Sequence, residues 1–364
     1  MQNSNKKNNI LILTQRVDIN DDVLGFMHSW VEEFAKHCEQ IIVVCLQRGK
    51  HNLPKKVRVL SLGKEEFLRY PRHFRFLRRL VALFRFYRYI LEERGSYDKV
   101  FVHMNQEYVL LGGIFWKLWR KKIGLWYAHG STSLSLKIAE KLSDIIFTST
   151  KSGFRLKSDK VKVVGQGIDI NTFKPGAEKK RNDIFKIISI GRISPVKDYE
   201  TLIKAVEILA EESVKLDVNI IGGVGMSKQK KYLEDLKKMI AEKRLGETIN
   251  FIGAVPNKNI ARYLQSADLF VNMSHTGSLD KAILEAMACG LPVLTCNEAL
   301  IEVLGEYKEI LMYNKGDYKN LAKKIKLFAD MEKEKREKIA KDLRDIVVRS
   351  HSLEGLIKKF VKMF

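Results

Sequence analysis

Two short stretches place charged residues beside glycines and expected helix starts. The stretch SIGRISPVKDYETL at 189–202 has Gly191 after an apolar run, followed by Arg192 and Lys197. The glycine permits a tight turn, and two cations just ahead of a helix suit a diphosphate, because the helix dipole also attracts negative charge. The same pattern is compatible with a solvated loop that holds two ordinary cations.

The stretch GSLDKAILEAMACGLPV at 277–293 places Glu285 within an apolar helix. A buried carboxylate is costly without partners, so we expect Glu285 to accept hydrogen bonds, for which a vicinal diol such as a ribose is suitable. A Glu on the solvent face of an amphipathic helix is the alternative. Gly277 and Ser278 are small and leave amides at the helix start open to an anion.

Other motifs narrow the range of ligands and cofactors that the chain is expected to bind. His129, in YAHG at 127–130, follows an apolar run and is suited to a sugar or phosphate oxygen, or to a structural role. The glycines of IIGGVG at 220–225 lack the G-x-G-x-x-G spacing and do not support nicotinamide binding. No D-x-D triplet occurs, so the sequence does not indicate a nucleotide-bound Mg²⁺ or Mn²⁺, and we expect neither metal nor cofactor.

These motifs follow apolar runs that alternate with helical patterns, which is typical of parallel sheets. Two such series, joined near 168–182, predict an α/β protein of two doubly wound domains, at 1–168 and 169–351. An apolar stripe in 352–364 predicts a helix that returns to the first domain. Strands are expected at 9–15, 40–46, 97–104, 123–130, 143–150, 160–167, 185–192, 215–225, 248–256, 267–274 and 291–297.

Taken together, the motifs resemble glycosyltransferase family 4, whose members have the GT-B fold of two Rossmann-like domains facing across a cleft. The resemblance is strongest from 160 to 297, where VKVVGQGIDINTFKP, ISIGRISPVKDYETLIKAV, NIIGGVG, INFIGAVP and LEAMACGLPV occur in the family's order. It implies a retaining, metal-independent hexosyltransferase. The donor would be a UDP- or GDP-sugar, and the acceptor a glycan or a lipid-linked acceptor in cell-surface polysaccharide or glycolipid synthesis.

The resemblance also implies roles for single residues. Arg192 and Lys197 match the cations that bind the donor diphosphate, and Glu285 matches the second Glu of a paired-Glu motif, which holds the donor ribose. The backbone around Val255 matches the segment at the nucleobase. His129 matches a histidine facing the transferred sugar, and Gly25 lies in a loop near the acceptor.

Gly277 departs from the family, which has its first Glu at this position, in contact with donor-sugar hydroxyls. One interpretation is a catalytically inactive nucleotide-sugar-binding protein. The other, which we favour, is that Asp280 and Lys281 replace the lost contact, because the other donor-binding residues are retained.

The net charge of +22 predicts an anionic partner. The stretch 67–91 contains no acidic residue and combines arginines with aromatic residues, including Phe86, that we expect to be exposed. This composition favours an anionic membrane surface, although a solvated basic face is an alternative. Nucleic acid is a weaker alternative, because no nucleic-acid-binding motif is present. The cations assigned to the membrane surface are Arg75, Arg78, Arg79, Arg85 and Arg88.

The chain shows neither a signal peptide nor an apolar run of membrane-spanning length. Its four cysteines form no C-x-x-C pair and are expected to be reduced core thiols. We therefore expect a cytoplasmic protein, peripherally associated with the inner face of the membrane.

Overall fold

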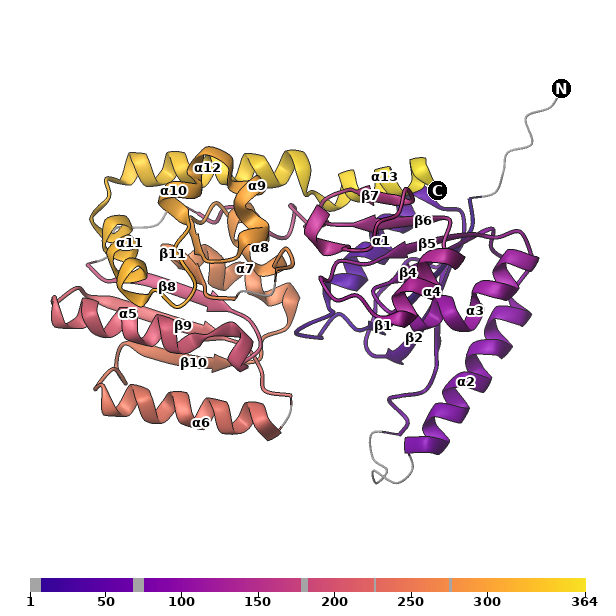
Figure 1. The fold of residues 1–364 in the computed structure, drawn as a ribbon, viewed down its shortest axis with the longest axis horizontal. Helices are drawn as coiled ribbons and strands as arrows, with labels where there is room; N and C mark the ends of the chain where they lie inside the picture. Colours follow the sequence, from indigo (N-terminus) through magenta and orange to yellow (C-terminus); the bar gives the residue numbers. More distant parts are fainter. Residues whose placement is uncertain (1–7, 68–74, 178–182, 226, 275–276) are drawn as a thin grey trace. The chain divides into compact units, whose positions relative to one another are not determined.

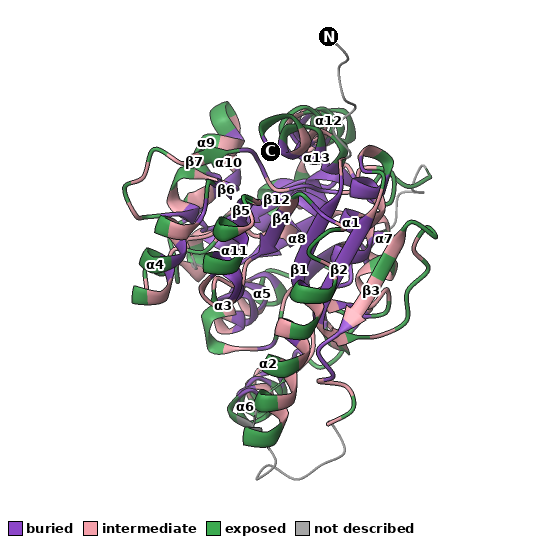
Figure 2. Ribbon diagram, turned by 90° about the vertical axis from the view of Figure 1, so that its right-hand side faces the viewer, coloured by how far each residue is buried: buried purple, intermediate pink, exposed green. Residues whose placement is uncertain are grey.

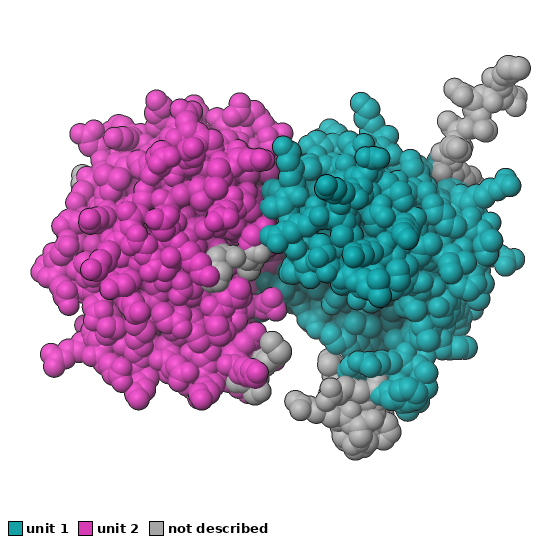
Figure 3. All heavy atoms as spheres, in the orientation of Figure 1, with its two compact units in different colours: residues 1–167, 353–364 teal, residues 168–352 magenta. Residues whose placement is uncertain are grey.

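The computed structural model describes residues 8–67, 75–177, 183–225, 227–274 and 277–364. The chain forms two compact units, coloured separately in Figure 3. Unit 1 comprises Met1–Gly167 and Leu353–Phe364, and unit 2 comprises Ile168–Ser352. The domain boundaries expected from the sequence lie one residue away from these.

Unit 1 contains a parallel sheet of seven strands in the order β3-β2-β1-β4-β5-β6-β7. Its central strands are runs of Ile, Leu and Val that are buried on both faces, as Figure 2 shows for β1 and β2. The strands are β1 (Ile10–Val17), β2 (Ile41–Arg48), β3 (Val57–Ser61), β4 (Lys99–His103), β5 (Lys122–Trp126), β6 (Ile145–Thr148) and β7 (Val161–Val163).

Helices cover both faces of this sheet (Figure 1). One face packs against α1 (Phe26–His37) and α13 (Leu353–Met363). The other packs against α2 (Arg75–Glu92), α3 (Glu107–Leu118) and α4 (Leu134–Leu142). The unit also has a short 3₁₀ turn, η2 (Lys151–Gly153).

Helix α13 is held by aromatic contacts. Leu356, Ile357 and Phe360 are buried, so the predicted apolar stripe does pack against the first domain. The Phe360 ring centroid lies 4.5 Å from that of Phe147 and 5.0 Å from that of Phe101. Aromatic pairs at such distances add to the stabilisation from area burial.

Unit 2 contains a parallel sheet of five strands in the order β10-β9-β8-β11-β12. The strands are β8 (Phe185–Ile190), β9 (Leu216–Ile221), β10 (Ile249–Gly253), β11 (Leu269–Asn272) and β12 (Val293–Thr295). The main helices are α5 (Tyr199–Glu211), α6 (Ser227–Glu242), α7 (Asn257–Ser266), α8 (Lys281–Ala288), α11 (Tyr318–Asp330) and α12 (Lys333–Ser350). Short helical turns are η3 (Pro195–Lys197), η4 (Glu298–Leu300), α9 (Ile301–Leu304), η5 (Gly305–Tyr307) and α10 (Lys308–Leu311).

Several expected strands end earlier than predicted, among them 123–130, which ends as β5 at Trp126. The run 160–167 forms only the three residues of β7, because Gly165 and Gly167 have φ of +92° and +74° and turn the chain out of the sheet. The run 215–225 ends as β9 at Ile221, before the glycine turn that begins at Gly222. The sequence prediction also missed β3, an edge strand that is only partly buried.

Replacing Phe360 by Ala should destabilise unit 1 by about 3–5 kcal/mol, because it empties a fully buried aromatic site. Chemical denaturation measures the loss. The matched control on the same helix is Met363→Ala, whose side chain is partly exposed and should cost much less. Equal losses in the two variants would contradict the packing described for α13.

Candidate functional site

The strand order of unit 2 reverses direction at β8, which pairs with β9 on one side and with β11 on the other. In open parallel sheets, ligands bind at the carboxyl ends of the strands beside such a reversal. Here the loop after β8 contains Gly191, Arg192 and Lys197, and β11 ends at Asn272. The cations predicted from the sequence therefore lie where this fold places its ligands.

Glycines allow these loops to approach one another closely. A Cβ atom on Gly222 would lie 1.8 Å from the carbonyl oxygen of Gly191, so a side chain cannot be accommodated there. A Cβ atom on Gly191 would lie 2.9 Å from Cε of Lys197. The glycine after β8 thus leaves room for the lysine side chain to cross the end of the strand.

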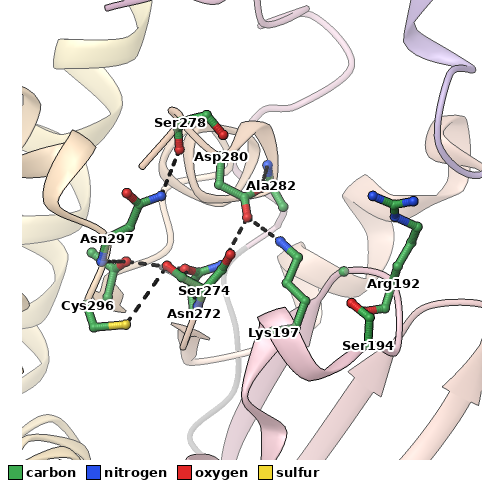
Figure 4. A network of polar contacts seen from close by, with 12 residues as sticks. Arg192, Ser194, Lys197, Asn272, Ser274, Ser278, Asp280, Ala282, Cys296 and Asn297 are labelled. Atoms are coloured by element: carbon green, nitrogen blue, oxygen red, sulfur yellow. Dashed lines mark hydrogen bonds and ion pairs between the residues drawn. The ribbon is translucent and has the colours of Figure 1, made fainter. Parts of the chain in front are cut away.

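Lys197 forms an ion pair with Asp280, the residue that caps the start of α8 (Figure 4). Lys197 Nζ donates to Asp280 Oδ2 at 2.5 Å, and both side chains are less than one-fifth exposed. Asn272 Nδ2 donates to the same oxygen at 3.2 Å, and the backbone N–H of Ala282 donates to Oδ1 at 3.2 Å. Burial raises the pKa of Asp280, but Lys197 and these donors outweigh it and hold the pKa below its ordinary value.

Arg192 differs from Lys197 in being exposed. Within the described residues, no hydrogen bond or ion pair engages its guanidinium group. Figure 4 shows both side chains extending from the same loop, with only Lys197 reaching Asp280. As far as the described parts of the chain show, Arg192 can therefore bind an anion without first losing a partner.

Glu285 lies in the interior of α8 and is 4% exposed. Asn257 Nδ2, at the start of α7, donates to Glu285 Oε1 at 3.2 Å. Burial raises the pKa of Glu285 above its ordinary value, and the nearby charge of Lys281 opposes that rise. Burial lowers the pKa of Lys281, partly offset by Glu285 and Asp169. The carboxyl group of Glu285 is thus buried and hydrogen-bonded, as expected from the sequence.

Gly277 has a φ of +67°, in the left-handed region where residues with a Cβ atom are strained. The backbone therefore favours glycine over a Glu at this position. The following Ser278 is fixed through its carbonyl oxygen, which accepts a hydrogen bond from Asn297 Nδ2 at 2.8 Å. Residues 275–276 lie outside the described part of the chain.

The remaining candidates are more dispersed. Val255 is buried just beyond the end of β10, in unit 2. His129 and Gly25 belong to unit 1. His129 is exposed and its Nδ1 accepts from the backbone N–H of Ser131 at 3.1 Å, while Gly25 is buried at the start of α1.

Three asparagines of the site were not anticipated. Asn272 and Asn297 are fully or almost fully buried and connect the ends of β11 and β12 to the segment before α8, and Asn257 contacts Glu285. Their position directly after an apolar run, as in FVN and LTCN, was the available signal. No group of three or more His, Cys, Asp or Glu side chains in the described ranges is arranged to hold a metal ion.

The basic helix α2 differs from its prediction in one respect. Phe86, which we expected to be exposed, is buried together with Ile90, because this face of α2 packs on the sheet. The apolar stripe on the neighbouring face is exposed instead, as Figure 2 shows along much of α2. Its exposed members are Phe76, Leu77, Leu80, Leu83, Phe84 and Leu91.

Two of the predicted surface arginines are engaged. Arg85 forms a two-bond ion pair with Glu66 at 2.8 and 2.9 Å, and Arg88 donates to Glu92 at 3.0 Å. Arg79 is exposed and Arg78 is partly exposed. Arg75 is the first residue of α2. The predicted residues 68–74 lie outside the described residues.

A family model described as "Glycosyl transferases group 1" matches residues 171–345, which is nearly all of unit 2. Unit 2 is therefore similar to this family. WcaL of Escherichia coli K12, whose name assigns it to colanic acid biosynthesis, is 26% identical over 52% of this chain and 47% of its own length. The amylovoran biosynthesis glycosyltransferase AmsK of Erwinia amylovora is 29% identical over 41% of this chain and 37% of its own. The match thus spans less than half the length of these relatives.

Solved structures match almost the whole chain and show that it has the GT-B fold. HepE of Anabaena, in complex with UDP and glucose, has a TM-score of 0.74 at 18% identity, over 97% of this chain and 98% of HepE. Sucrose-phosphate synthase of Thermosynechococcus elongatus has a TM-score of 0.79 at 16% identity, over 98% of both chains. The fold expected from the sequence is confirmed.

Glu285 should make stability depend on pH. Because its pKa is raised in the folded protein, folding favours the protonated form, and this contribution is lost as pH rises above the ordinary value of 4.5. Glu285→Gln has no carboxyl group to ionise and so loses no stability in this way. The variant should therefore gain stability relative to wild type between about pH 5 and pH 7. Thermal melts across this range measure the difference, and parallel curves would contradict the burial of an ionisable Glu285.

Proposed function

We propose that the protein transfers a hexose from a nucleoside-diphosphate sugar to a glycan or lipid-linked acceptor, with retention of configuration and without a metal ion. The observation that most supports this is the meeting of two features at the β8/β11 reversal. A loop with Arg192 and Lys197 follows β8, and α8, with Glu285 buried inside it, starts after β11. This pairing suits a nucleoside diphosphate, with cations for the phosphates and a carboxylate for the ribose.

Arg192 and Lys197 would bind the diphosphate and stabilise the charge that develops on it as the bond to the anomeric carbon breaks. The acceptor hydroxyl would form the new bond to that carbon on the same face. Its proton would pass to the leaving phosphate oxygen, so the step needs no strong protein base. A mechanism of this kind tolerates the absence of a carboxylate at Gly277.

Other residues would bind the rest of the donor. Glu285 would accept hydrogen bonds from the ribose hydroxyls, and the backbone around Val255 would meet the nucleobase. Gly277, Ser278 and Lys281 would border the sugar and diphosphate at the start of α8. In unit 1, His129 would face the transferred sugar and Gly25 would lie on the acceptor side.

UDP- and GDP-sugars are the donors we propose. HepE has been solved in complex with UDP-glucose, which supports a uridine donor for a chain of the same fold. The similarity to WcaL and AmsK supports a role in cell-surface polysaccharide synthesis.

A catalytically inactive nucleotide-sugar-binding protein is the second candidate. The observation that favours it is Gly277, whose left-handed backbone does not suit the carboxylate that the family has there. Such a protein would bind the nucleotide sugar without releasing nucleoside diphosphate. Nucleic-acid binding rests on the net charge of +22 alone and would be insensitive to nucleotide.

We also propose that unit 1 binds an anionic membrane surface through α2 and α3. Phe76 and Phe84 on α2 are 71% and 68% exposed, and Leu118 on α3 is 74% exposed. The helices are in contact, because the hydroxyl of Tyr87 donates to the carbonyl oxygen of Leu111 at 3.3 Å.

On α2, Arg79 is exposed and Arg78 is partly exposed, and both can attract an anionic leaflet. Arg85 and Arg88 are paired with Glu66 and Glu92. The described helices include none that is long and apolar enough to cross a bilayer. The proposal is therefore peripheral binding to the inner face of the membrane.

Arg192→Ala and Glu285→Ala should each reduce turnover on the order of a hundredfold, because each removes a charged contact to the donor. Release of nucleoside diphosphate from a panel of UDP- and GDP-sugars, in the presence of acceptor, measures this. The control is Lys204→Ala, which removes an exposed cation of α5 that lies over the ring of Tyr318 and has no contact described for the site, and it should leave turnover unchanged. Nucleotide binding without any release would favour the inactive candidate instead.

Leu80→Glu with Phe84→Glu should abolish flotation with vesicles that contain phosphatidylserine, because it places charges in the apolar stripe. Both residues are exposed, so the fold should be retained. The control is Leu327→Glu, an equally exposed leucine in unit 2. Equal flotation of wild type and the double variant, or of wild type with neutral and anionic vesicles, would count against this surface.

A further inference from the structure

The carboxylate of Asp280 accepts three hydrogen bonds from protein donors. Its Oδ2 accepts from Lys197 and Asn272, and its Oδ1 accepts from the backbone of Ala282. Asn272 is itself fixed, because its Oδ1 accepts from the backbone N–H of Ser274 at 3.1 Å. A group held in this way is poorly placed to exchange its partners for sugar hydroxyls, which was the role expected from the sequence.

The ion pair changes the charge that an incoming diphosphate meets. Lys197 and Asp280 together have no net charge, so the exposed Arg192 is left as the full cation of this loop. A diphosphate that reaches Lys197 also comes close to the carboxylate. Since the pair is largely buried, water screens that repulsion only weakly.

This repulsion weakens binding of the nucleotide-sugar donor and of the nucleoside diphosphate product to different extents. A nucleotide sugar has a diphosphate that is esterified at both ends, with about two negative charges. The released nucleoside diphosphate has a terminal phosphate, whose second ionisation near pH 6 adds about one more. A fixed negative charge beside the diphosphate therefore weakens binding of the product more than binding of the donor.

Resting on the proposed function, we propose that Asp280 is a positioning residue that holds Lys197 in place and lowers the affinity of the site for the nucleoside diphosphate product relative to the donor. Asp280 thereby favours product release. In this role it occupies Lys197 between turnovers and does not touch the sugar.

The groups around Asp280 allow the effect to be isolated by pH. The titratable groups facing it are Lys197 from η3, Tyr199 from α5, and Lys281 and Glu285 on α8. Burial raises the pKa of Tyr199, so that it stays neutral, and Glu285 would contact the ribose that donor and product share. Lys281 and Glu285 are present in both wild type and variant, so the change in the donor-to-product affinity ratio when only Asp280 is altered reports its effect on the terminal phosphate.

The test is Asp280→Asn, which keeps a side-chain oxygen able to cap α8 and removes the charge. Affinities for UDP and UDP-glucose, and for GDP and GDP-mannose, are measured by calorimetry on the full chain. At about pH 8 the variant should bind the diphosphate on the order of tenfold more tightly, with a clearly smaller gain for the nucleotide sugar. Near pH 5 the difference between the two gains should disappear, as the terminal phosphate takes up a proton.

The matched control is Asp268→Asn, which removes the same charge at the opposite end of β11, where Asp268 accepts from the backbone of Lys186. It should change neither affinity. Equal gains for donor and product in Asp280→Asn, no change, or weaker binding of both would overturn the role of Asp280 and leave the donor site standing. Failure of the wild type to bind any of the four ligands would instead contradict the donor site itself.

Discussion

The candidate site depends on keeping charged side chains buried at the carboxyl ends of one parallel sheet. A buried ion loses its hydration, so it is tolerated only where several partners compensate it. Lys197 and Asp280 compensate each other's charge in an ion pair. Asn272 and the backbone N–H of Ala282 donate further hydrogen bonds to the Asp280 carboxylate. Because these partners come from the loop after β8, from the end of β11 and from α8, the ion pair connects three elements that the sheet order brings together.

The same constraint separates the two cations that looked equivalent in the sequence. Lys197 is largely buried and paired, whereas Arg192 is exposed. An exposed arginine can bind a diphosphate with two parallel hydrogen bonds. A lysine that is paired with a carboxylate binds the diphosphate less strongly, because the carboxylate offsets its charge. The proposed site therefore combines a permanent anion-binding residue with one whose strength Asp280 adjusts.

The sequence predicted the sheets well, because buried parallel strands are runs of Ile, Leu and Val that differ plainly from their surroundings. It indicated Lys197 as a candidate from its place between a glycine turn and a helix start, and Glu285 from its place within an apolar helix. It did not predict that Lys197 pairs with Asp280, since 83 residues separate them and only the strand order brings them together. The burial of Phe86 was missed for a related reason: two apolar faces of α2 compete for one sheet, and packing selects Phe86 and Ile90.

The central claim is that the loop after β8 and the helix α8 bind a nucleoside diphosphate. A crystal structure of the full chain with the nucleotide sugar that it turns over tests this most directly. The account predicts that Arg192 and Lys197 lie within hydrogen-bond distance of the diphosphate and that Glu285 accepts from the ribose hydroxyls. A nucleotide bound elsewhere, with the Lys197 and Asp280 pair and Glu285 making no contact to it, would contradict the account.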